Sequence, residues 1–290
     1  MHYSGAVYRP PSEAYSLIIQ VTLGCSHNKC AFCNMYKAKK FSINPIEQVM
    51  EDLAWARAKY SRIERIFLAD GDALILPTDH LLRILDFIRT EFPECERVST
   101  YASPRSILGK TAQDLKKLRE AGLAMAYLGL ETGNDALLTK INKGVTVAQQ
   151  VECGQKLKEA GMILSVTAIN GLAGSNGDWE AHAVDTAHAL SAMKPDYIAL
   201  LTLRIYTGTP MAKWIEDGEL VMPQPMELIR ETRLLLSEID AEGSIFRSNH
   251  ASNYLVLKGT LNRDREAMIA QCDAALRGEA QLRKYVELGR

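Results

Sequence analysis

Residues 16–33 read SLIIQVTLGCSHNKCAFC, an apolar run followed at once by three cysteines. The run is compact and rich in branched aliphatic side chains, which is typical of a buried strand. Cys25, Cys30 and Cys33 follow it in the pattern C-x4-C-x2-C. The sequence therefore predicts a strand that delivers three thiols to a loop at its carboxyl end.

Further short apolar runs follow along the chain, with helical patterns between them. The expected strands are 16–22, 63–69, 96–101, 124–130, 162–169 and 196–203. The expected helices are 45–60, 78–92, 111–121, 146–160 and 178–193. Strict alternation of strands and helices indicates a parallel sheet with right-handed crossovers. The predicted fold class is α/β, a partial (β/α)6 TIM-like barrel with its active site at the carboxyl ends of the strands.

The pattern changes after about residue 205. A helix is expected from near Pro225, followed by a polar stretch and one or two helices from about residue 263. No repeat or linker divides the chain before this change. We therefore expect a core domain over residues 1–215 and a mostly helical C-terminal extension over residues 216–290 that closes the active site.

The charge balance argues against a highly charged partner. The 290 residues include 34 basic and 35 acidic ones, so the net charge is -1 and no overall field attracts nucleic acid or an anionic membrane. No apolar run is long enough to span a membrane, and no secretion signal is evident. We expect a cytoplasmic protein, where clustered thiols indicate a metal or catalysis more than disulfides. A local basic patch surrounds the cysteines, formed by Lys29, Lys37, Lys39 and Lys40.

The three thiols suit a metal centre, and more than one kind is open. Structural zinc takes four protein ligands, and no fourth Cys or His follows at finger spacing, although His27 lies inside the loop. Two-iron ferredoxins share the C-x4-C-x2-C spacing but need a fourth cysteine, and the next one, Cys95, comes after another strand and helix. A four-iron cluster held by three thiolates is the remaining option, and it leaves one iron open to a ligand.

The cysteine loop resembles that of the radical S-adenosylmethionine (SAM) superfamily, which places an aromatic residue, here Phe32, before the third cysteine. The usual family spacing is C-x3-C-x2-C, so this loop is one residue longer. Later strand ends are also similar to family segments: ADGDAL at 69–74, GLETG at 129–133, AINGLAG at 168–174 and YTGTPM at 206–211. The resemblance covers residues 14 to 215 and is strongest to methylthiotransferases and oxygen-independent coproporphyrinogen oxidases.

This resemblance implies cofactors and residue roles. A 4Fe–4S cluster would be held by Cys25, Cys30 and Cys33, with SAM on the open iron. Gly71 and Asp72 would meet the methionine amino group, Glu131 the ribose hydroxyls, Lys143 the carboxylate and Phe32 the adenine. From the residues alone, Asp70 and Asp72 could instead cap a turn, Glu131 could lie in an ordinary turn, and Lys143 could be a solvated charge.

The implied activity is that of an oxygen-sensitive radical SAM enzyme. Reductive cleavage of SAM would give a 5′-deoxyadenosyl radical that abstracts hydrogen from a small-molecule substrate, with an electron donor such as flavodoxin or ferredoxin. The alternative is a non-catalytic iron–sulfur electron carrier or sensor, with Cys95 or another group as fourth ligand. A weaker alternative is an RNA-modifying radical SAM enzyme, since the lysines near the loop could contact RNA.

The sequence offers three candidate catalytic residues for the substrate. His250 lies in the polar stretch RSNHASNY, residues 247–254, and its ordinary pKa suits proton transfer. Arg204 and Tyr206 follow the sixth expected strand and would face the active-site mouth. The same Asn and Ser residues could simply satisfy the backbone of a turn. The sequence predicts neither the substrate nor the oligomeric state.

Overall fold

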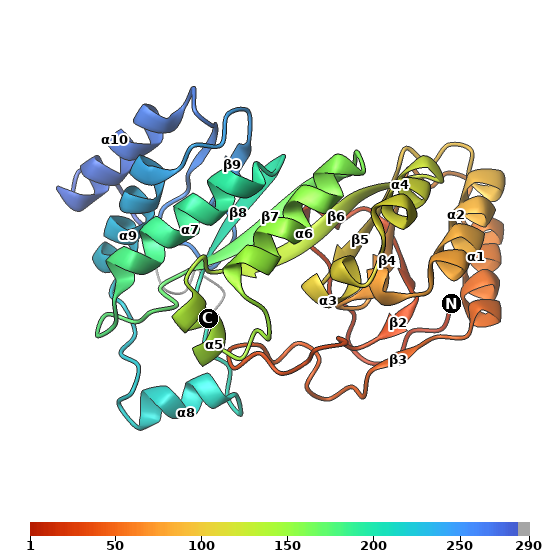
Figure 1. Ribbon diagram of the computed structural model, residues 1–290, viewed down its shortest axis with the longest axis horizontal. Coiled ribbons are helices and arrows are strands. Elements are labelled where there is room, and N and C mark those ends of the chain that lie inside the picture. Colours follow the sequence, from red (N-terminus) through yellow and green to blue (C-terminus); the bar gives the residue numbers. More distant parts are fainter. Residues whose placement is uncertain (284–290) are drawn as a thin grey trace. The chain divides into compact units, whose positions relative to one another are not determined.

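In the computed structural model, which describes residues 1–283, the chain forms two compact units (Figure 1). The first contains Met1–Asn28, Met35–Leu128 and Gln155–Leu164. The second contains Lys29–Asn34, Gly129–Gly154 and the chain from Ser165 onward. The cysteine loop is therefore divided between the units, because Cys25 belongs to the first and the other two cysteines to the second.

The first unit is built on parallel strands in the order β1, β4, β5, β6. These strands are β1 (Leu17–Gln20), β4 (Arg65–Ala69), β5 (Arg97–Ala102) and the start of β6 (Leu123–Glu131). A two-stranded antiparallel ribbon pairs β2 (Thr22–Leu23) with β3 (Ser42–Ile43). The helical segments are η1 (Pro11–Glu13), α1 (Ile46–Lys59), η2 (Ala73–Ile75), α2 (Thr78–Glu91), α3 (Pro104–Leu108) and α4 (Ala112–Glu120).

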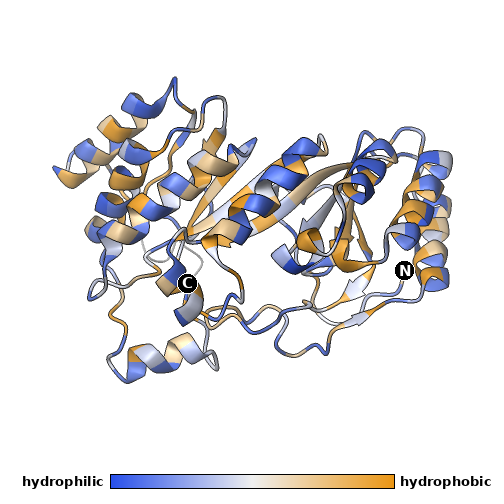
Figure 2. Ribbon diagram, viewed as in Figure 1, coloured by the Kyte–Doolittle hydropathy of each residue, from blue (hydrophilic) through white to orange (hydrophobic). Residues whose placement is uncertain are grey.

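Burial follows the pattern expected of a parallel sheet covered by helices. Four of the five residues of β4 are buried, because helices or neighbouring chain cover both faces of such a strand. Helices α1 and α2 contact each other and carry apolar and polar residues on the same helix, as the mixed colours in Figure 2 show. Burying the apolar stripe of each helix stabilises this arrangement, and the polar stripe stays in contact with water.

The second unit continues with a mixed sheet in the order β7, β8, β9, β10. β7 (Ile163–Asn170), which lies in this unit from Ser165 onward, pairs in parallel with β8 (Tyr197–Thr202), and β8 pairs in parallel with β9 (Ile245–Arg247). β10 (Lys258–Thr260) is antiparallel to β9. Helix α9 contacts both α7 and α10. The helices here are α5 (Asp135–Lys140), the first part of α6 (Val147–Glu159), α7 (Trp179–Met193), α8 (Pro210–Glu216), α9 (Pro225–Glu238) and α10 (Arg265–Leu276).

The α/β class predicted from the sequence is confirmed, and each expected strand and helix has a counterpart within a few residues. The strands form no closed barrel in the part of the chain that the structure describes. Of the extension expected to be mostly helical, residues 216–290, the described part ends at residue 283. It contains α9 and α10 but also β9 and β10, which extend the sheet, and residues 284–290 lie outside the described residues. The division into domains at residue 215 stays a prediction. Over residues 1–283, no helix combines the length and apolar character needed to cross a membrane.

Candidate cofactor site

The cysteine loop leaves and re-enters the first unit through the β2–β3 ribbon, in which Thr22 pairs with Ile43 and Leu23 with Ser42. Gly24 follows β2 with φ of +77°, a conformation that favours glycine. Cys25 comes next and is a partly exposed residue. The ribbon thus sets the position of the first cysteine at the end of the strand.

The segment with the other two cysteines is anchored inside the second unit. The Ala31 amide donates to the Ile141 carbonyl at 2.8 Å, and the Met211 amide donates to the Ala31 carbonyl at 3.1 Å. Phe32 packs against an apolar cluster that includes Ala31, Ile141 and Met211. Phe32 therefore packs onto this apolar cluster. Its contact with adenine stays a prediction. Cys30 and Cys33 are partly exposed, as Cys25 is.

Within residues 1–283 no group of three or more His, Cys, Asp or Glu side chains is gathered as a metal site. The joint use of Cys25, Cys30 and Cys33 thus stays a prediction. Cys95 has local contacts of a structural kind: its thiol donates to the Arg97 carbonyl, and burial raises its pKa. Cys153 and Cys272 are buried, as expected of small apolar side chains.

The turn after β4 packs closely on the start of the cysteine loop. A β-carbon added to Gly71 would lie 2.5 Å from Cε2 of Tyr36 and 3.0 Å from Cβ of Cys25. Only glycine fits here without displacing the aromatic ring. The sequence predicts that Gly71 lets the backbone approach a ligand. The structure shows a further reason for a glycine here, which is the close contact between this turn and the cysteine loop.

The two carboxylates of this turn are both buried, and their contacts differ. Asp72 accepts hydrogen bonds from the Ser26 hydroxyl and from the Ser103 amide at 3.1 Å and hydroxyl at 2.7 Å. Burial raises the pKa of Asp72, and the hydrogen bonds from these serines oppose the rise. Because Ser103 is the N-cap residue of α3, Asp72 holds a helix start in place. Its contact with SAM stays a prediction.

The sequence did not predict Asp70 as a site residue, yet its side chain contacts several parts of the first unit. Its Oδ2 accepts from Gln20 Nε2 at 2.9 Å, from the Gly24 amide at 3.0 Å and from Lys39 Nζ at 2.7 Å. The Asp70 amide in turn donates to the Thr22 hydroxyl at 3.0 Å. No sequence signal separated Lys39 from its neighbours in the basic patch, so this ion pair was not foreseen.

The turn after β6 brings Glu131 and Lys143 together, both predicted to bind SAM. Lys143 Nζ lies 2.7 Å from Glu131 Oε1, and each side chain is 12% exposed. Glu131 has φ of +65°, a left-handed conformation that costs a non-glycine residue on the order of 1 kcal/mol or more. A β-carbon on Gly129 would collide with Glu131 Oε1, so glycine makes room for the carboxylate. The pair is mostly buried, and Glu131 is held in a strained turn.

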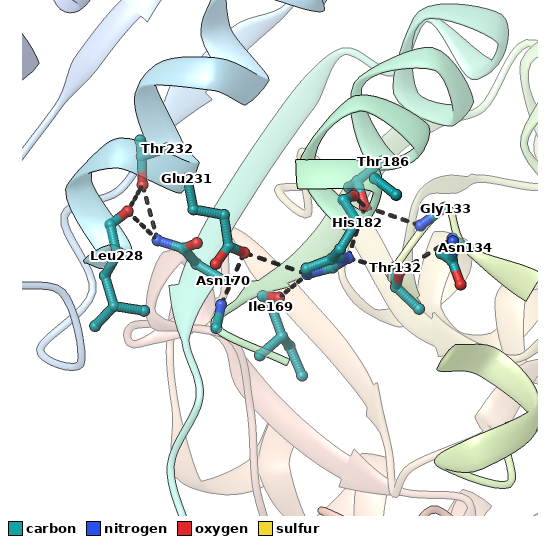
Figure 3. A network of polar contacts seen from close by, with 12 residues as sticks. Thr132, Gly133, Asn134, Ile169, Asn170, His182, Thr186, Leu228, Glu231 and Thr232 are labelled. Carbon is teal, nitrogen blue, oxygen red and sulfur yellow. Dashed lines mark hydrogen bonds and ion pairs between the residues drawn. The ribbon is translucent and has the colours of Figure 1, made fainter. Parts of the chain in front are cut away.

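The rest of the GLETG segment docks on α7, as Figure 3 shows. Thr132 Oγ1 lies 2.8 Å from Nδ1 of His182, and the Gly133 amide donates to the Thr186 hydroxyl at 2.9 Å. A β-carbon on Gly133 would collide with the backbone of α7 at Asp185. Thr132 and Gly133 therefore fix the turn that carries Glu131.

A buried pair behind this turn was missed in the sequence (Figure 3). His182 Nε2 lies 3.1 Å from the Ile169 carbonyl and 3.3 Å from Oε1 of Glu231, which accepts from the Gly171 amide at 2.9 Å. Burial lowers the pKa of His182 to about 4 and raises the pKa of Glu231 to about 8. Both side chains therefore favour their neutral forms near pH 7. Nothing local signals this contact, because the partners are far apart in sequence.

The polar stretch at 247–254 ties the end of β8 to the following chain. The Thr202 amide donates to the Ser252 hydroxyl at 3.1 Å, and Asn253 Nδ2 donates to the Leu200 carbonyl at 2.8 Å. The Ser252 amide donates to Nδ1 of His250 at 3.1 Å. Ser252 and Asn253 thus form hydrogen bonds with backbone groups. This agrees with the alternative that the Asn and Ser residues of this stretch satisfy the backbone of a turn.

The three candidate catalytic residues stay predictions. Burial lowers the pKa of His250, and the positive charges of Arg204 and Arg283 lower it further. Arg204 and His250 are therefore electrostatically coupled within one unit. Tyr206 is 38% exposed, and its carbonyl accepts the hydroxyl of Thr209, the N-cap of α8, at 2.7 Å.

These features define a class: a mostly parallel α/β protein related to (β/α) barrels, with glycine-containing polar turns at the carboxyl ends of its strands. The family model of the radical SAM superfamily matches residues 19–186, more than half of the chain. The chain belongs to this superfamily, whose members are enzymes that use a 4Fe–4S cluster and S-adenosylmethionine.

Relatives and solved structures agree with this assignment. The heme chaperone HemW of Bacillus subtilis (strain 168) is 24% identical over 226 residues, covering 76% of this chain and 58% of that protein. The chain thus spans about three fifths of the length of such relatives. Coproporphyrinogen III oxidase (HemN) from Escherichia coli matches with a TM-score of 0.58 at 16% identity, covering 77% of this chain and 52% of that one. Methylornithine synthase (PylB) matches with a TM-score of 0.55 at 16% identity, covering 93% and 74%.

Proposed function

We propose that the protein is a radical SAM enzyme that acts on a small-molecule substrate. Cys25, Cys30 and Cys33 would hold a 4Fe–4S cluster with one iron open to SAM. The observation that carries this proposal is a loop with three partly exposed, free cysteines after the first strand, inside the region matched by the family. When bound and reduced, such a cluster supplies the electron that cleaves SAM to methionine and a 5′-deoxyadenosyl radical.

Glu131 and Lys143 would bind two ends of SAM. The carboxylate of Glu131 suits the ribose hydroxyls, and the ammonium of Lys143 suits the methionine carboxylate. Their ion pair of 2.7 Å holds both groups in defined positions before a ligand arrives. A left-handed glutamate is a conformation found mostly where a ligand site requires it, which supports this role.

Gly71 and Asp72 would lie near the methionine amino group, which the contact of Gly71 with Cys25 supports. Phe32 would approach the adenine from its apolar cluster. His250, with its lowered pKa, would be neutral near pH 7 and able to accept a proton from substrate, beside Arg204 and Tyr206. The electron donor would be a flavodoxin or ferredoxin in the cytoplasm, where a reducing environment preserves thiols.

The test is production of 5′-deoxyadenosine. Protein reconstituted with iron and sulfide without oxygen is reduced with dithionite, given SAM and analysed by chromatography. We expect 5′-deoxyadenosine from the native chain and from Cys95→Ala, and none from Cys30→Ala. Loss of the cluster in Cys95→Ala would instead favour an iron–sulfur carrier with Cys95 as fourth ligand.

A second candidate function is binding of haem, favoured by the similarity of the chain to heme chaperones. A protein of this kind would be expected to change the Soret absorption of haemin on binding. Titration of haemin into the reconstituted chain measures this directly. Saturation at one haem per chain would support the candidate, and an unchanged spectrum at micromolar protein would exclude it.

A further inference from the structure

The cysteine loop has a narrow neck whose two sides meet at one side chain. Asp70, at the end of β4, accepts the amide of Gly24 at 3.0 Å, immediately before Cys25. The same oxygen, Oδ2, accepts Nζ of Lys39 at 2.7 Å, after the third cysteine. The Gly71 amide adds a bond to the Gly24 carbonyl at 3.1 Å. The turn after β4 therefore contacts the chain both where it enters the cysteine loop, at Gly24, and where it leaves the loop, at Lys39.

This contact is buried. The side chain of Asp70 is fully buried, and that of Lys39 is 9% exposed. Removing one partner of such a pair leaves an uncompensated charge out of water, which is strongly unfavourable. The packing is equally close, because a β-carbon on Gly24 would lie 3.3 Å from Cβ of Lys39. Lys39 is therefore a structural part of the neck, although the sequence places it in a basic patch.

A second contact lies in the stretch between Cys25 and Cys30, which is one residue longer than the usual family spacing. Asn28 has φ of +44°, a left-handed conformation that asparagine tolerates better than most residues. Its Nδ2 donates to the Tyr36 carbonyl at 2.8 Å, and its carbonyl accepts Nζ of Lys37 at 2.7 Å. The longer spacing thus contains a residue that ties the outgoing chain to the returning chain.

We infer that Asp70, Lys39 and Asn28 form a loop clamp that orders the cysteine loop before any cluster is bound. They are positioning residues: the contacts of Asp70, Lys39 and Asn28 are with the chain before Cys25 and after Cys33. The inference rests on the proposed function, because an ordered loop matters for holding a cluster.

The clamp is tested first in the protein without iron. Hydrogen–deuterium exchange of peptides covering residues 24–41 is compared between the native chain, Lys39→Met and Lys40→Met. Lys40 is an exposed neighbour, so the control removes the same charge from the same loop. We expect exchange in these peptides to be about tenfold faster in Lys39→Met, the effect of about 1.4 kcal/mol, and unchanged in Lys40→Met.

A double variant separates loss of the clamp from general misfolding. Lys39→Met combined with Asp70→Asn removes both charges, so no unpaired charge is left buried. We expect this chain to fold, with native exchange in α9 and α10, and still to show fast exchange over residues 24–41. Asn28→Gly keeps the backbone conformation accessible and removes the side-chain bond, so we expect a smaller increase, about threefold.

The second measurement is release of iron from reconstituted protein to a ferrous chelator. Lys39→Met and Asn28→Gly should lose iron faster than the native chain, and Lys40→Met at the native rate. If the native chain binds no iron, the proposed function fails while the exchange result still tests the clamp. If residues 24–41 exchange equally in the native chain and in Lys39→Met, the clamp is overturned whatever the iron content.

Discussion

The turns after β4 and β6 both place carboxylates at the carboxyl end of a parallel strand, but they differ in what those carboxylates contact. After β4, Asp70 and Asp72 are fully buried; Asp72 and the Oδ2 atom of Asp70 bond to the surrounding chain, while Oδ1 of Asp70 is buried without a hydrogen-bond partner in the described residues. After β6, Glu131 is partly exposed, strained at φ of +65°, and paired with one lysine. The contacts of the first turn are those of a structural turn. The second turn leaves a carboxylate and an ammonium group that could contact a ligand.

This difference shows that a motif position does not fix a role. The sequence resemblance gave Asp72 and Glu131 parallel roles in SAM binding. In the structure, the neighbours of each carboxylate decide how much of its bonding capacity is already used. Substitutions should therefore affect stability most in the first turn and ligand affinity most in the second.

The largest effect is expected at Asp70. Asp70→Asn leaves the ammonium of Lys39 buried without a counter-charge, so the free energy of unfolding should fall by about 3 kcal/mol. Asp72→Asn keeps an acceptor for its serine partners, and burial already raises the pKa of Asp72, so its loss should stay under about 1 kcal/mol. Urea denaturation of both variants measures the difference. Equal losses would remove the distinction between the two carboxylates.

An intermediate effect is expected at Glu131, on ligand affinity. Glu131→Gln should weaken SAM binding to the reconstituted protein about thirtyfold, the equivalent of about 2 kcal/mol for hydrogen bonds to a charged group. Glu131→Gly should abolish that contribution; it relieves the positive φ but also removes the ion pair with Lys143, so SAM affinity and not stability is the readout. Exposed Glu152→Gln is the matched control. Native affinity in Glu131→Gln would show that the second turn does not bind SAM.

The smallest effect is expected behind the second turn, from the pH dependence of stability. The pKa of Glu231 is raised from 4.5 to about 8, so from pH 6.5 to 8.5 the folded chain retains a proton that the unfolded chain has released. The free energy of unfolding should therefore fall as the pH rises, by about 1–2 kcal/mol more in the native chain than in Glu231→Gln.

Between pH 4.5 and 6.5 the two buried groups act in opposite directions. The pKa of His182 is lowered from 6.5 to about 4, so there the unfolded chain binds a proton that folded His182 excludes. This raises stability with pH while Glu231 lowers it, and the combined slope should be near zero. Denaturation midpoints at several pH values measure both ranges. A native chain and a Glu231→Gln variant with parallel profiles would rule out a protonated Glu231.

Much of the fold followed from the sequence because long periodic segments carry a local signal. Strands such as β4 and β7 and helices such as α1 and α7 were expected within a few residues of their bounds. The misses were short elements: the strands β2, β3, β9 and β10 and the helical segments η1, η2, α3, α5 and α8. Such elements form because of distant partners, as β9 does on β8, and no local pattern predicts them.

The candidate site divides in the same way. The residues of the turns could be selected from their motifs, but their contacts could not. The ion pair of Lys39 with Asp70 joins residues 31 positions apart, and the contact of His182 with Glu231 joins two helices. Both contacts depend on tertiary placement and burial. For this reason Lys39, which the sequence places in a basic patch, and Glu231, which it places on an amphipathic helix, have buried contacts that the sequence did not predict.

The most direct test of the central claim, a cluster with an iron open to SAM, is electron paramagnetic resonance of the dithionite-reduced protein with and without SAM. We predict about four irons per chain and a 4Fe–4S signal whose g values shift when SAM is added. Cys30→Ala should lose the signal. A two-iron signal, or a 4Fe–4S signal that SAM leaves unchanged, would contradict the account.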